Sequence, residues 1–438
     1  MLLTYSLENY RGFRGRTEFS LQRSSVSEAG FVHRKYVKAR KSPIEAVAIA
    51  CLFGGNGSGK SQFLQSLSDI RTIVLGLRGP RRLGVDESDS PVDLVDATKA
   101  SLEIVLDDEI IQYAIEFDNF RVLREEIYVK STQRPGLLYR VERGKLTLGS
   151  ELKAIVSDGI AIAGDGSLLR YFAQLGSPTS SKLTEWFRSN FRYANETNRA
   201  QRWALTATML RQPQYFEPMR SLLLEADLGV DDFFIDHLDE RALERISLFA
   251  EVWRGGDVLG AFDLIDLREP ADIGIRLLHG KERLNEASIN LDEESSGTKV
   301  WFGAIGIILD TLVRGSVLLA DELDTSMHPN LVRLIISIFQ SPISNPKCAQ
   351  LITNSQDVSL LETTANSRIL GRDQVWFCNR NEDGSLKVEP LSRYSPRRSE
   401  AIQKRYLEGD YGGVPKRFDL GLIETLGDSV ASIVSPKG

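Results

Sequence analysis

A short glycine-rich stretch, GGNGSGKS, occupies residues 54–61 and restricts the fold more than any other feature of the chain. The residues before it, 46–54, form an apolar run of strand length, and residues 61–77 repeat apolar side chains at helical spacing. The stretch fits the pattern GxxxxGK[ST], and the order strand, loop, helix is the context typical of a phosphate-binding loop. Glycines have no Cβ, so such a loop can wrap closely around a phosphate and direct backbone N–H groups at it. We therefore predict an α/β nucleotide-binding fold.

The loop also assigns chemical roles to the residues that follow its glycines. Lys60 is expected to pair with the β and γ phosphates of a nucleotide, and Ser61 is expected to ligate Mg²⁺. The N-terminus of the following helix adds a positive partial charge for the phosphates. The other nucleotide-binding residues predicted in this stretch are Gly54, Gly55, Asn56, Gly57, Ser58, Gly59 and Gln62.

A second motif, SVLLADE at residues 316–322, ends an apolar strand in two carboxylates. Strands often end in acidic residues, so this signal is weak alone, but the phosphate loop upstream favours a catalytic interpretation. An unpaired carboxylate on a buried strand is also costly to desolvate. Asp321 is then predicted to hold Mg²⁺ through water, and Glu322 to polarise the attacking water as the catalytic base.

A third motif, EESSGTK at residues 293–299, begins the helix that leads to the acidic strand. Ser295 or Ser296 could simply cap this helix. A serine and a glycine at a helix N-terminus would also make a receptor for a γ-phosphate. The stretch alone is compatible with both interpretations.

Composition and charge exclude several classes of protein. The chain is 42% hydrophobic and 26% charged, as in ordinary globular proteins. The formal net charge of −6 argues against a uniformly basic nucleic-acid-binding surface, although two basic patches, residues 33–41 and 77–82, leave contact with DNA open. The three cysteines lack CxxC spacing, so neither a disulfide framework nor a zinc site is indicated. No signal peptide and no membrane-spanning stretch is found, so we expect a cytoplasmic protein without a membrane partner.

Three parts are predicted along the chain. Residues 1–165 form an N-terminal ATPase lobe that contains the phosphate loop, a strand hairpin and an antiparallel meander. Residues 166–270 carry helical signals and form an inserted helical lobe. Residues 271–438 form a C-terminal ATPase lobe, where strands alternating with helices predict a largely parallel sheet.

Smaller elements are predicted within these parts. The segment 79–98 is rich in Gly, Pro, Asp and Ser and is expected to be an exposed loop. The hairpin over residues 273–291 is expected to return the chain to the sheet. The four histidines are expected to be structural, because His33, His237 and His279 are not matched by nearby acids and His328 precedes a proline. The expected core anchors of the helical lobe are Trp186, Phe187, Trp203, Phe233 and Phe234.

The set FGGNGSGKS, EESSGTK, LLADELDTSMHP and AQLITNSQD resembles the head of the SMC, RecF and ABC-type ATPases. More narrowly, the chain resembles the prokaryotic AAA-type ATPases of abortive infection, the RloA-like group that includes the AriA subunit of the PARIS phage defence. Further matches are ENYRGF, LLHG, RDQVWF and KRYLEGDYGGVP, so the resemblance spans almost the whole chain. It implies a P-loop NTPase head of the ABC/SMC type with an antiparallel β-subdomain and an inserted helical lobe.

The resemblance also implies roles for residues outside the phosphate loop. Ser296 and Gly297 would meet the γ-phosphate of a second subunit, and Asp324 would be the acid that crosses the dimer interface, although it could also cap the helix that starts at Pro329. Related proteins usually read TTHD where this chain reads NSQD, which puts Gln356 at the position of the switch histidine. A glutamine can donate a hydrogen bond but cannot take up a proton, so slow hydrolysis is expected.

Two mutational expectations follow from these roles. Replacing Glu322 by alanine should trap the nucleotide, and replacing Gln356 by alanine should weaken turnover less. Gln112, on a predicted strand, is a candidate for the Q-loop glutamine of ABC proteins.

The resemblance leaves three functions to weigh. The favoured one is an ATP-driven homodimer or higher homo-oligomer that acts as sensor or scaffold for a separately encoded toxic effector, Toprim-like or similar, with a phage protein as trigger. The alternative is a DNA-processing ATPase like RecF or the SMC heads. A nuclease with a fused Toprim domain is disfavoured, because the segment after Asp357 contains no DxD pair. The acidic charge balance and the C-terminal matches favour the first.

Overall fold

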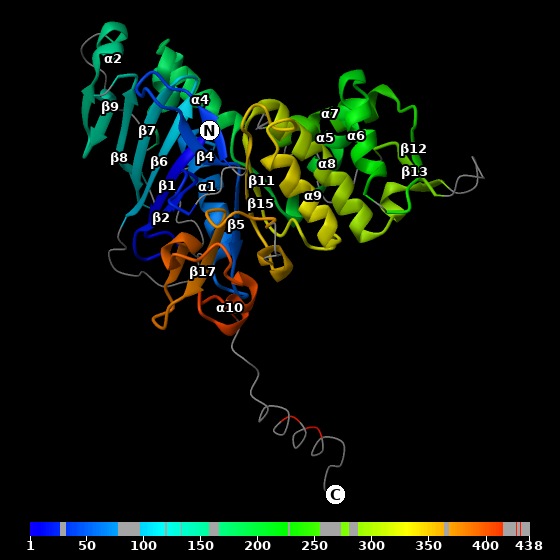
Figure 1. Cartoon of the computed structure of the whole chain (residues 1–438). Coiled ribbons are helices and arrows are strands. Elements are labelled where there is room, and N and C mark those ends of the chain that lie inside the picture. Colours follow the sequence, from blue (N-terminus) through cyan, green and yellow to red (C-terminus); the bar gives the residue numbers. More distant parts are fainter. Residues whose placement is uncertain are drawn as a thin grey trace, which may run out of the picture.

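The computed structural model describes residues 1–26, 32–77, 97–118, 121–132, 134–156, 166–226, 228–254, 273–279, 288–362 and 368–414, together with Leu426 and Val430. An antiparallel sheet and a parallel core sheet lie side by side, and a helical lobe extends from the parallel sheet (Figure 1). The predicted loop 79–98 falls almost wholly outside the described residues.

The core sheet has the strand order β11-β15-β16-β5-β17-β18. All neighbours pair in parallel except the edge strand β18, which is antiparallel to β17. Every residue of β5 and β16 is buried, as expected of central strands covered on both faces. The strands are β5 (Ile49–Phe53), β11 (Arg192–Ala194), β15 (Val317–Ala320), β16 (Gln350–Asn354), β17 (Val375–Arg380) and β18 (Leu386–Pro390).

The apolar run 46–54 was predicted as one strand. This prediction was wrong for the first residues of the run, which belong to another strand. Ala48 separates β4 (Ile44–Val47), which pairs with β3 (Val32–Lys35), from β5, which enters the core sheet. The apolar pattern is continuous across Ala48, but the two halves pair with different partners. Strand pairing is a tertiary choice that the local pattern does not contain.

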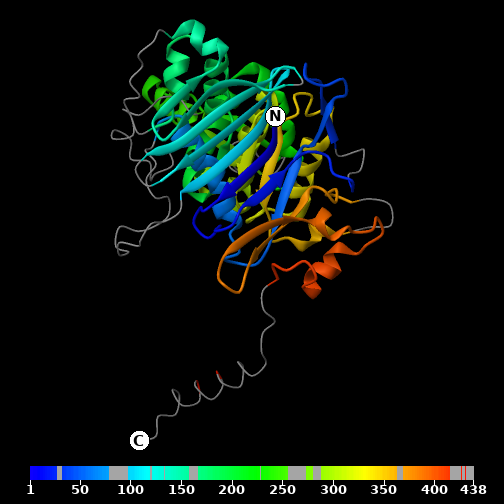
Figure 2. The same cartoon turned by 90° about the vertical axis from the view of Figure 1, so that its left-hand side faces the viewer.

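The second sheet is antiparallel, in the order β10-β9-β8-β7-β6-β1-β2, and Figure 2 shows its broad outer face. It confirms the predicted hairpin and meander. Helix α1 (Lys60–Val74) is buried between the two sheets, and Phe63 contacts the rings of Tyr5 and Phe19. The strands are β1 (Leu2–Glu8), β2 (Thr17–Ser20), β6 (Thr98–Leu106), β7 (Glu109–Phe117), β8 (Val122–Lys130), β9 (Gly136–Glu142) and β10 (Lys145–Leu148).

Three helices pack beside the antiparallel sheet: α2 (Ser150–Ile155), α3 (Leu169–Gln174) and α4 (Pro178–Ser189). Phe187 of α4 lies edge-on to Tyr113, with ring centroids 5.3 Å apart. Trp186 and Phe187 are therefore buried in the core of this sheet, and their prediction as anchors of the helical lobe was wrong. Trp203 and Phe233 do lie in the core that the helical lobe shares with the parallel sheet, whereas Phe234 is only partly buried.

The helical lobe, seen on the right of Figure 1, contains α5 (Arg199–Leu210), α6 (Pro213–Leu224), α7 (Glu240–Arg254) and α8 (Ser296–Arg314). Helix α8 lies outside the predicted bounds 166–270 of this lobe and was predicted as part of the C-terminal lobe. The lobe also contains a small sheet of β12 (Asp232–Ile235), β13 (Ile275–Leu278) and β14 (Ser288–Asn290). The predicted hairpin over 273–291 is present as β13 and β14, but its return to the main sheet was wrong because β13 pairs with β12. The other α-helices in the described part of the chain are α9 (Pro329–Gln340) and α10 (Ile402–Glu408).

Helices α5 and α8 cross closely at Gly303 and Gly306 of α8. A Cβ added to Gly306 would lie 2.4 Å from Thr206 Oγ1 and 2.8 Å from Thr206 Cα. The Thr206 hydroxyl donates a hydrogen bond to the carbonyl of Phe302 (2.9 Å), and the indole N–H of Trp203 donates to the carbonyl of Lys299 (3.0 Å). The position of α8 is thus tied to α5. Among the described helices, α8 alone is long and apolar enough to cross a membrane by length and composition, yet 67% of that window is buried inside the protein.

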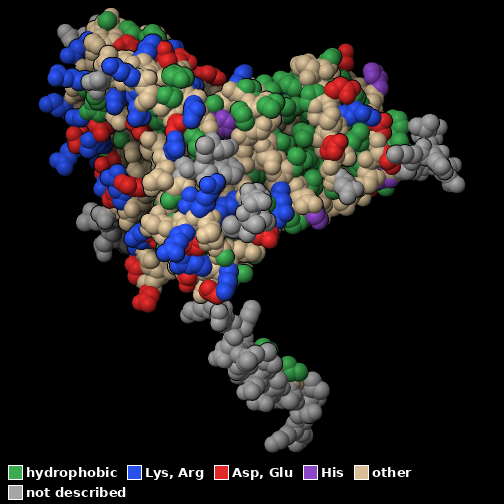
Figure 3. Space-filling view, viewed as in Figure 1, with side chains coloured by type: hydrophobic (Ala, Val, Ile, Leu, Met, Phe, Trp, Pro, Cys, Tyr) green, Lys and Arg blue, Asp and Glu red, His purple; other side chains and the backbone are tan. Residues whose placement is uncertain are grey.

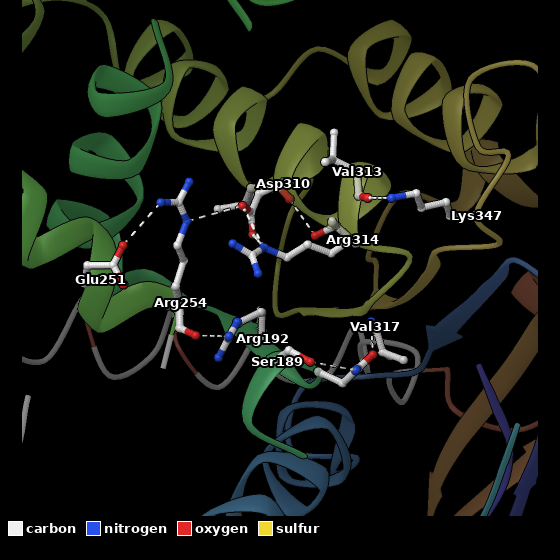
Figure 4. Close-up of polar contacts among 12 residues, drawn as sticks. Ser189, Arg192, Glu251, Arg254, Asp310, Val313, Arg314, Val317 and Lys347 are labelled. Carbon is white, nitrogen blue, oxygen red and sulfur yellow. Dashed lines mark hydrogen bonds and ion pairs between the residues drawn. The ribbon is translucent and has the colours of Figure 1, made fainter. Parts of the chain in front are cut away.

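The buried Arg192 joins the helical lobe to the core sheet (Figure 4). Arg192 of β11 donates to the carbonyl of Arg254, the last residue of α7. Carbonyls at a helix C-terminus carry a partial negative charge, which stabilises a guanidinium there. Burial lowers the pKa of Arg192 to about 9. Arg254 and Arg314 both contact the carboxylate of Asp310 on α8 (3.4 Å and 3.0 Å).

Candidate functional site: a phosphate loop and a strand-end carboxylate

The phosphate loop joins β5 to α1 at the carboxyl edge of the core sheet. Gly57 and Gly59 have φ angles of 73° and 94°, in the left-handed region that only glycine adopts at little cost. A Cβ at Gly54 would lie 2.5 Å from the carbonyl oxygen of Cys378. The backbone of β17 therefore leaves no space for a side chain at the first glycine of the loop.

Lys60, the first residue of α1, folds back into the loop. Its side chain is buried, and Nζ donates to the carbonyls of Gly54 (2.6 Å) and Gly55 (3.1 Å). The ammonium thus lies inside the glycine loop, where an incoming phosphate would meet it. Ser58 Oγ is buried and has no hydrogen-bond partner among the described residues.

Asp321 follows β15 and collects donors from three elements. Its Oδ1 accepts from the Ser61 hydroxyl (2.8 Å) and from Asn354 Nδ2 (2.5 Å), and its Oδ2 accepts from the Tyr193 hydroxyl (2.7 Å). The carboxyl ends of parallel strands meet at one edge of a sheet, which is why residues so far apart converge. Ser61 and Asp321, the predicted metal pair, are in direct contact. A hydroxyl and a carboxylate are hard oxygen ligands of the kind that Mg²⁺ takes, so the pair fits this ion.

Asn354, at the end of β16, connects the two carboxylate residues. Besides its bond to Asp321, its Oδ1 accepts from the backbone N–H of Glu322 (2.5 Å). Glu322 has a φ of 54°, a strained conformation for a residue with a Cβ, and its side chain is exposed. Asn354 is 1% exposed and stabilises this turn. Asn354 is part of the sequence motif AQLITNSQD, but the sequence predicted no role for this residue.

Asp324, in the loop after β15, contacts the segment after β16 that carries Gln356. Its Oδ2 accepts from the Ser355 hydroxyl (2.6 Å) and from the backbone N–H of Gln356 (3.1 Å). The side chain of Gln356 is exposed. The alternative that Asp324 caps the helix at Pro329 was wrong: the N-cap of α9 is His328, whose Nδ1 accepts from the N–H of Asn330.

The structure shows which serine caps α8 at its N-terminal tip. Ser295 is the N-cap and accepts from the backbone N–H of Thr298 (3.2 Å). Ser296 is therefore not needed as a cap, and it is exposed. A Cβ at Gly297 would lie 2.8 Å from the carbonyl of Ser326, so the tip packs on the loop that follows Asp324. Among the described residues, no hydrogen bond joins Ser296 or Gly297 to the phosphate loop of the same chain.

Two site residues had no signal in the sequence, and the candidate Q-loop glutamine was wrong. Arg380, the last residue of β17, donates to the carbonyl of Gly57 through Nη2 (2.7 Å) and steadies the loop apex. Tyr193 lies on a strand that was predicted as part of a helical region. Gln112 is on β7 of the antiparallel sheet, bonded to Glu103, and not beside the metal pair.

His279 is paired with an acid, contrary to the expectation. Its Nε2 lies 2.6 Å from Oε1 of Glu294, and its Nδ1 lies 2.8 Å from the carbonyl of Gly229. Glu294 is buried directly before the N-cap of α8, so the contact ties the small sheet to the base of the serine-bearing tip. Burial lowers the pKa of His279, but the hydrogen bond and the charge of Glu294 outweigh it and raise the pKa above its usual value.

We expect this pair to make stability depend on pH. Because the pKa of His279 is raised on folding, its contribution is complete below the ordinary pKa of about 6.5 and is lost as pH rises through the folded value. The free energy of unfolding, measured with urea, should therefore decrease by up to about 1 kcal/mol as the pH rises through this window. This decrease is in addition to any that the His279→Gln variant shows over the same window. His237→Gln, at an exposed histidine, is the control. An identical pH dependence in wild type and His279→Gln would contradict the assignment.

These features define the class of the protein. The chain has the P-loop fold of ABC-type ATPases, with a phosphate loop that encloses its own lysine, a serine in contact with a strand-end aspartate, and an antiparallel sheet beside a parallel one. The chain belongs to the family described as "AAA domain, putative AbiEii toxin, Type IV TA system", which matches residues 49–362. ATPases of this class use ATP with Mg²⁺.

Solved structures similar to the chain include two SMC heads. The SMC head bound to the C-winged helix domain of ScpA is 10% identical, with a TM-score of 0.43 over 90% of this chain and 99% of that chain. The SMC head domain from Thermotoga maritima is 12% identical, with a TM-score of 0.40 over 89% of this chain and 98% of that chain. A search of curated proteins found no match.

Proposed function

We propose that the chain binds and slowly hydrolyses ATP, and that ATP joins two copies of it. The observation that carries this proposal is the convergence of Lys60, Ser61 and Asp321 at one edge of the core sheet. Lys60 would bind the β and γ phosphates. Ser61 and Asp321 would hold Mg²⁺, which would offset the phosphate charge when bound.

Glu322 is the proposed catalytic base. It follows the metal aspartate directly, and its side chain is exposed at the open edge of the sheet, where an attacking water could reach it. Gln356 lies on the segment bonded to Asp324 and would contact the γ-phosphate or the water through its amide. Because an amide cannot accept a proton as an imidazole does, turnover is expected to be slow and the ATP-bound dimer long-lived.

The second copy would complete the site. Ser296 is exposed at the N-terminus of a helix of 19 residues, and its neighbour Gly297 packs on the segment carrying Asp324. The tip makes no hydrogen bond to its own phosphate loop within the described part of the chain, so it is available to bind the γ-phosphate held by a partner. A dimer of this kind would place two nucleotides between the subunits.

A test of this arrangement uses the Glu322→Gln variant, which should retain ATP. Light scattering is expected to give a dimer with MgATP and a monomer without nucleotide. When Ser296→Arg is added to this variant, we expect a monomer both with and without MgATP. The affinity for ATP should stay within about threefold of that of Glu322→Gln alone, because the tip contacts only the partner's nucleotide. Ser181→Arg, at an exposed serine of α4, should leave the dimer intact. A dimer that persists in the Ser296→Arg variant would refute the role of the tip.

We further propose a role in anti-phage defence in the cytoplasm. The motif resemblance to the RloA-like group, which includes AriA of PARIS, and the family description naming an AbiEii toxin support this role. The ATP-bound assembly would hold a separately encoded effector, Toprim-like or similar, and release it when a phage protein appears. Co-purification from the native host, with masses measured with and without ATP, tests for such an effector.

The alternative of a DNA-processing ATPase is not favoured. In the described basic patch, Arg34 pairs with Glu45 (2.7 Å) and Lys38 with Asp108 (3.1 Å), so part of its charge is neutralised. Figure 3 shows Lys and Arg side chains interspersed with Asp and Glu on the face that it presents. The arginines of the second patch lie outside the described residues. Salt-sensitive DNA binding by the purified protein would favour this alternative.

A further inference from the structure

We propose that Tyr193 is a positioning residue of the ATPase site, which holds one oxygen of Asp321 so that the other faces Ser61 and the metal. This inference rests on the proposed function. The Tyr193 hydroxyl donates to Oδ2 of Asp321 at 2.7 Å, whereas Oδ1 accepts from Ser61 and Asn354. The two carboxylate oxygens are therefore held by different groups, and the carboxylate plane has one orientation.

The backbone places Tyr193 for this role. In the parallel pairing of β11 with β15, Ala194 is opposite Ala320, and the N–H of Asp321 donates to the carbonyl of Ala194 (2.8 Å). The strand that carries the phenol is thus bonded directly to the residue that the phenol holds. A fixed strand-to-strand register leaves little freedom for the side chains to separate.

The side chain of Asn198 holds the backbone of Tyr193 in place. Asn198 Nδ2 donates to the carbonyl of Tyr193 (2.5 Å), and Asn198 Oδ1 accepts from the N–H of Asn195 (3.2 Å). These contacts close the turn between β11 and α5.

Groups that orient a metal ligand typically change metal affinity by about 10-fold to 100-fold when removed. The Tyr193→Phe variant keeps the ring and removes only the donor. We expect ATP binding in EDTA to be unchanged, measured with a fluorescent ATP analogue. With ATP present, the apparent dissociation constant of Mn²⁺, measured by electron paramagnetic resonance, is expected to rise about tenfold.

Tyr113→Phe is the matched control, because Tyr113 donates to the buried carboxylate of Glu125 (2.7 Å) in the antiparallel sheet, away from the site. It should leave the Mn²⁺ affinity unchanged. An unchanged Mn²⁺ affinity in Tyr193→Phe overturns the inference, as does an equal loss of ATP binding in EDTA, which would indicate a purely structural role. Absence of ATP binding by the wild-type protein would instead refute the proposed function, and this inference with it.

Discussion

Replacing Glu322 by glutamine is expected to lower ATP turnover by at least about 100-fold and to leave ATP binding intact. A positioned general base contributes a factor of this size, and an amide cannot accept the proton of the attacking water. The backbone of Glu322 is held by Asn354, so the substitution should leave the turn unchanged. Phosphate release under steady-state conditions, together with retention of ATP on a desalted sample, measures both effects.

Two comparisons sharpen this expectation. Gln356→Ala should reduce turnover less than Glu322→Gln, because Gln356 offers a hydrogen bond and no proton transfer. Glu244→Gln, at an exposed glutamate of α7, should have no effect. Unchanged turnover in Glu322→Gln would show that another group activates the water.

Replacing Gly306 by alanine is expected to destabilise the protein by about 2 kcal/mol, within the range for overpacking a close contact. The new Cβ would lie 2.4 Å from Thr206 Oγ1, and backbone atoms of Thr206 lie within 2.9 Å, so the two helices must separate. Urea unfolding measures the change in the free energy of unfolding. Dimer formation with MgATP should also weaken, because α8 carries Ser296.

Gly303→Ala is the matched control on the same helix. There the added carbon meets only side-chain atoms, the nearest being Trp203 Cδ1 at 3.1 Å, which can shift slightly. Both variants gain the same helix propensity, of about 1 kcal/mol, so the difference between them isolates the steric cost. Equal stability of the two variants would contradict the close crossing of α5 and α8.

Much of the fold could be predicted because its signals are local. A glycine loop between an apolar strand and an amphipathic helix has few other uses, and the alternating pattern of residues 101–130 predicts an antiparallel meander. The pairing of distant strands had no such signal. The hairpin over 273–291 was predicted correctly, but its partner β12 was not. Phe187 was predicted to be buried, but the sheet that buries it was not.

By itself, the sequence determined the phosphate loop, the acidic strand end and the serine-bearing helix tip, because each needs particular residue types at short spacing. Only the tertiary structure decided which side chains complete the site. Tyr193 is 128 positions from Asp321, and Arg380 is 323 positions from Gly57. Such contacts depend on strand order and register, which arise when separate segments bury their apolar faces together, and no local pattern records them.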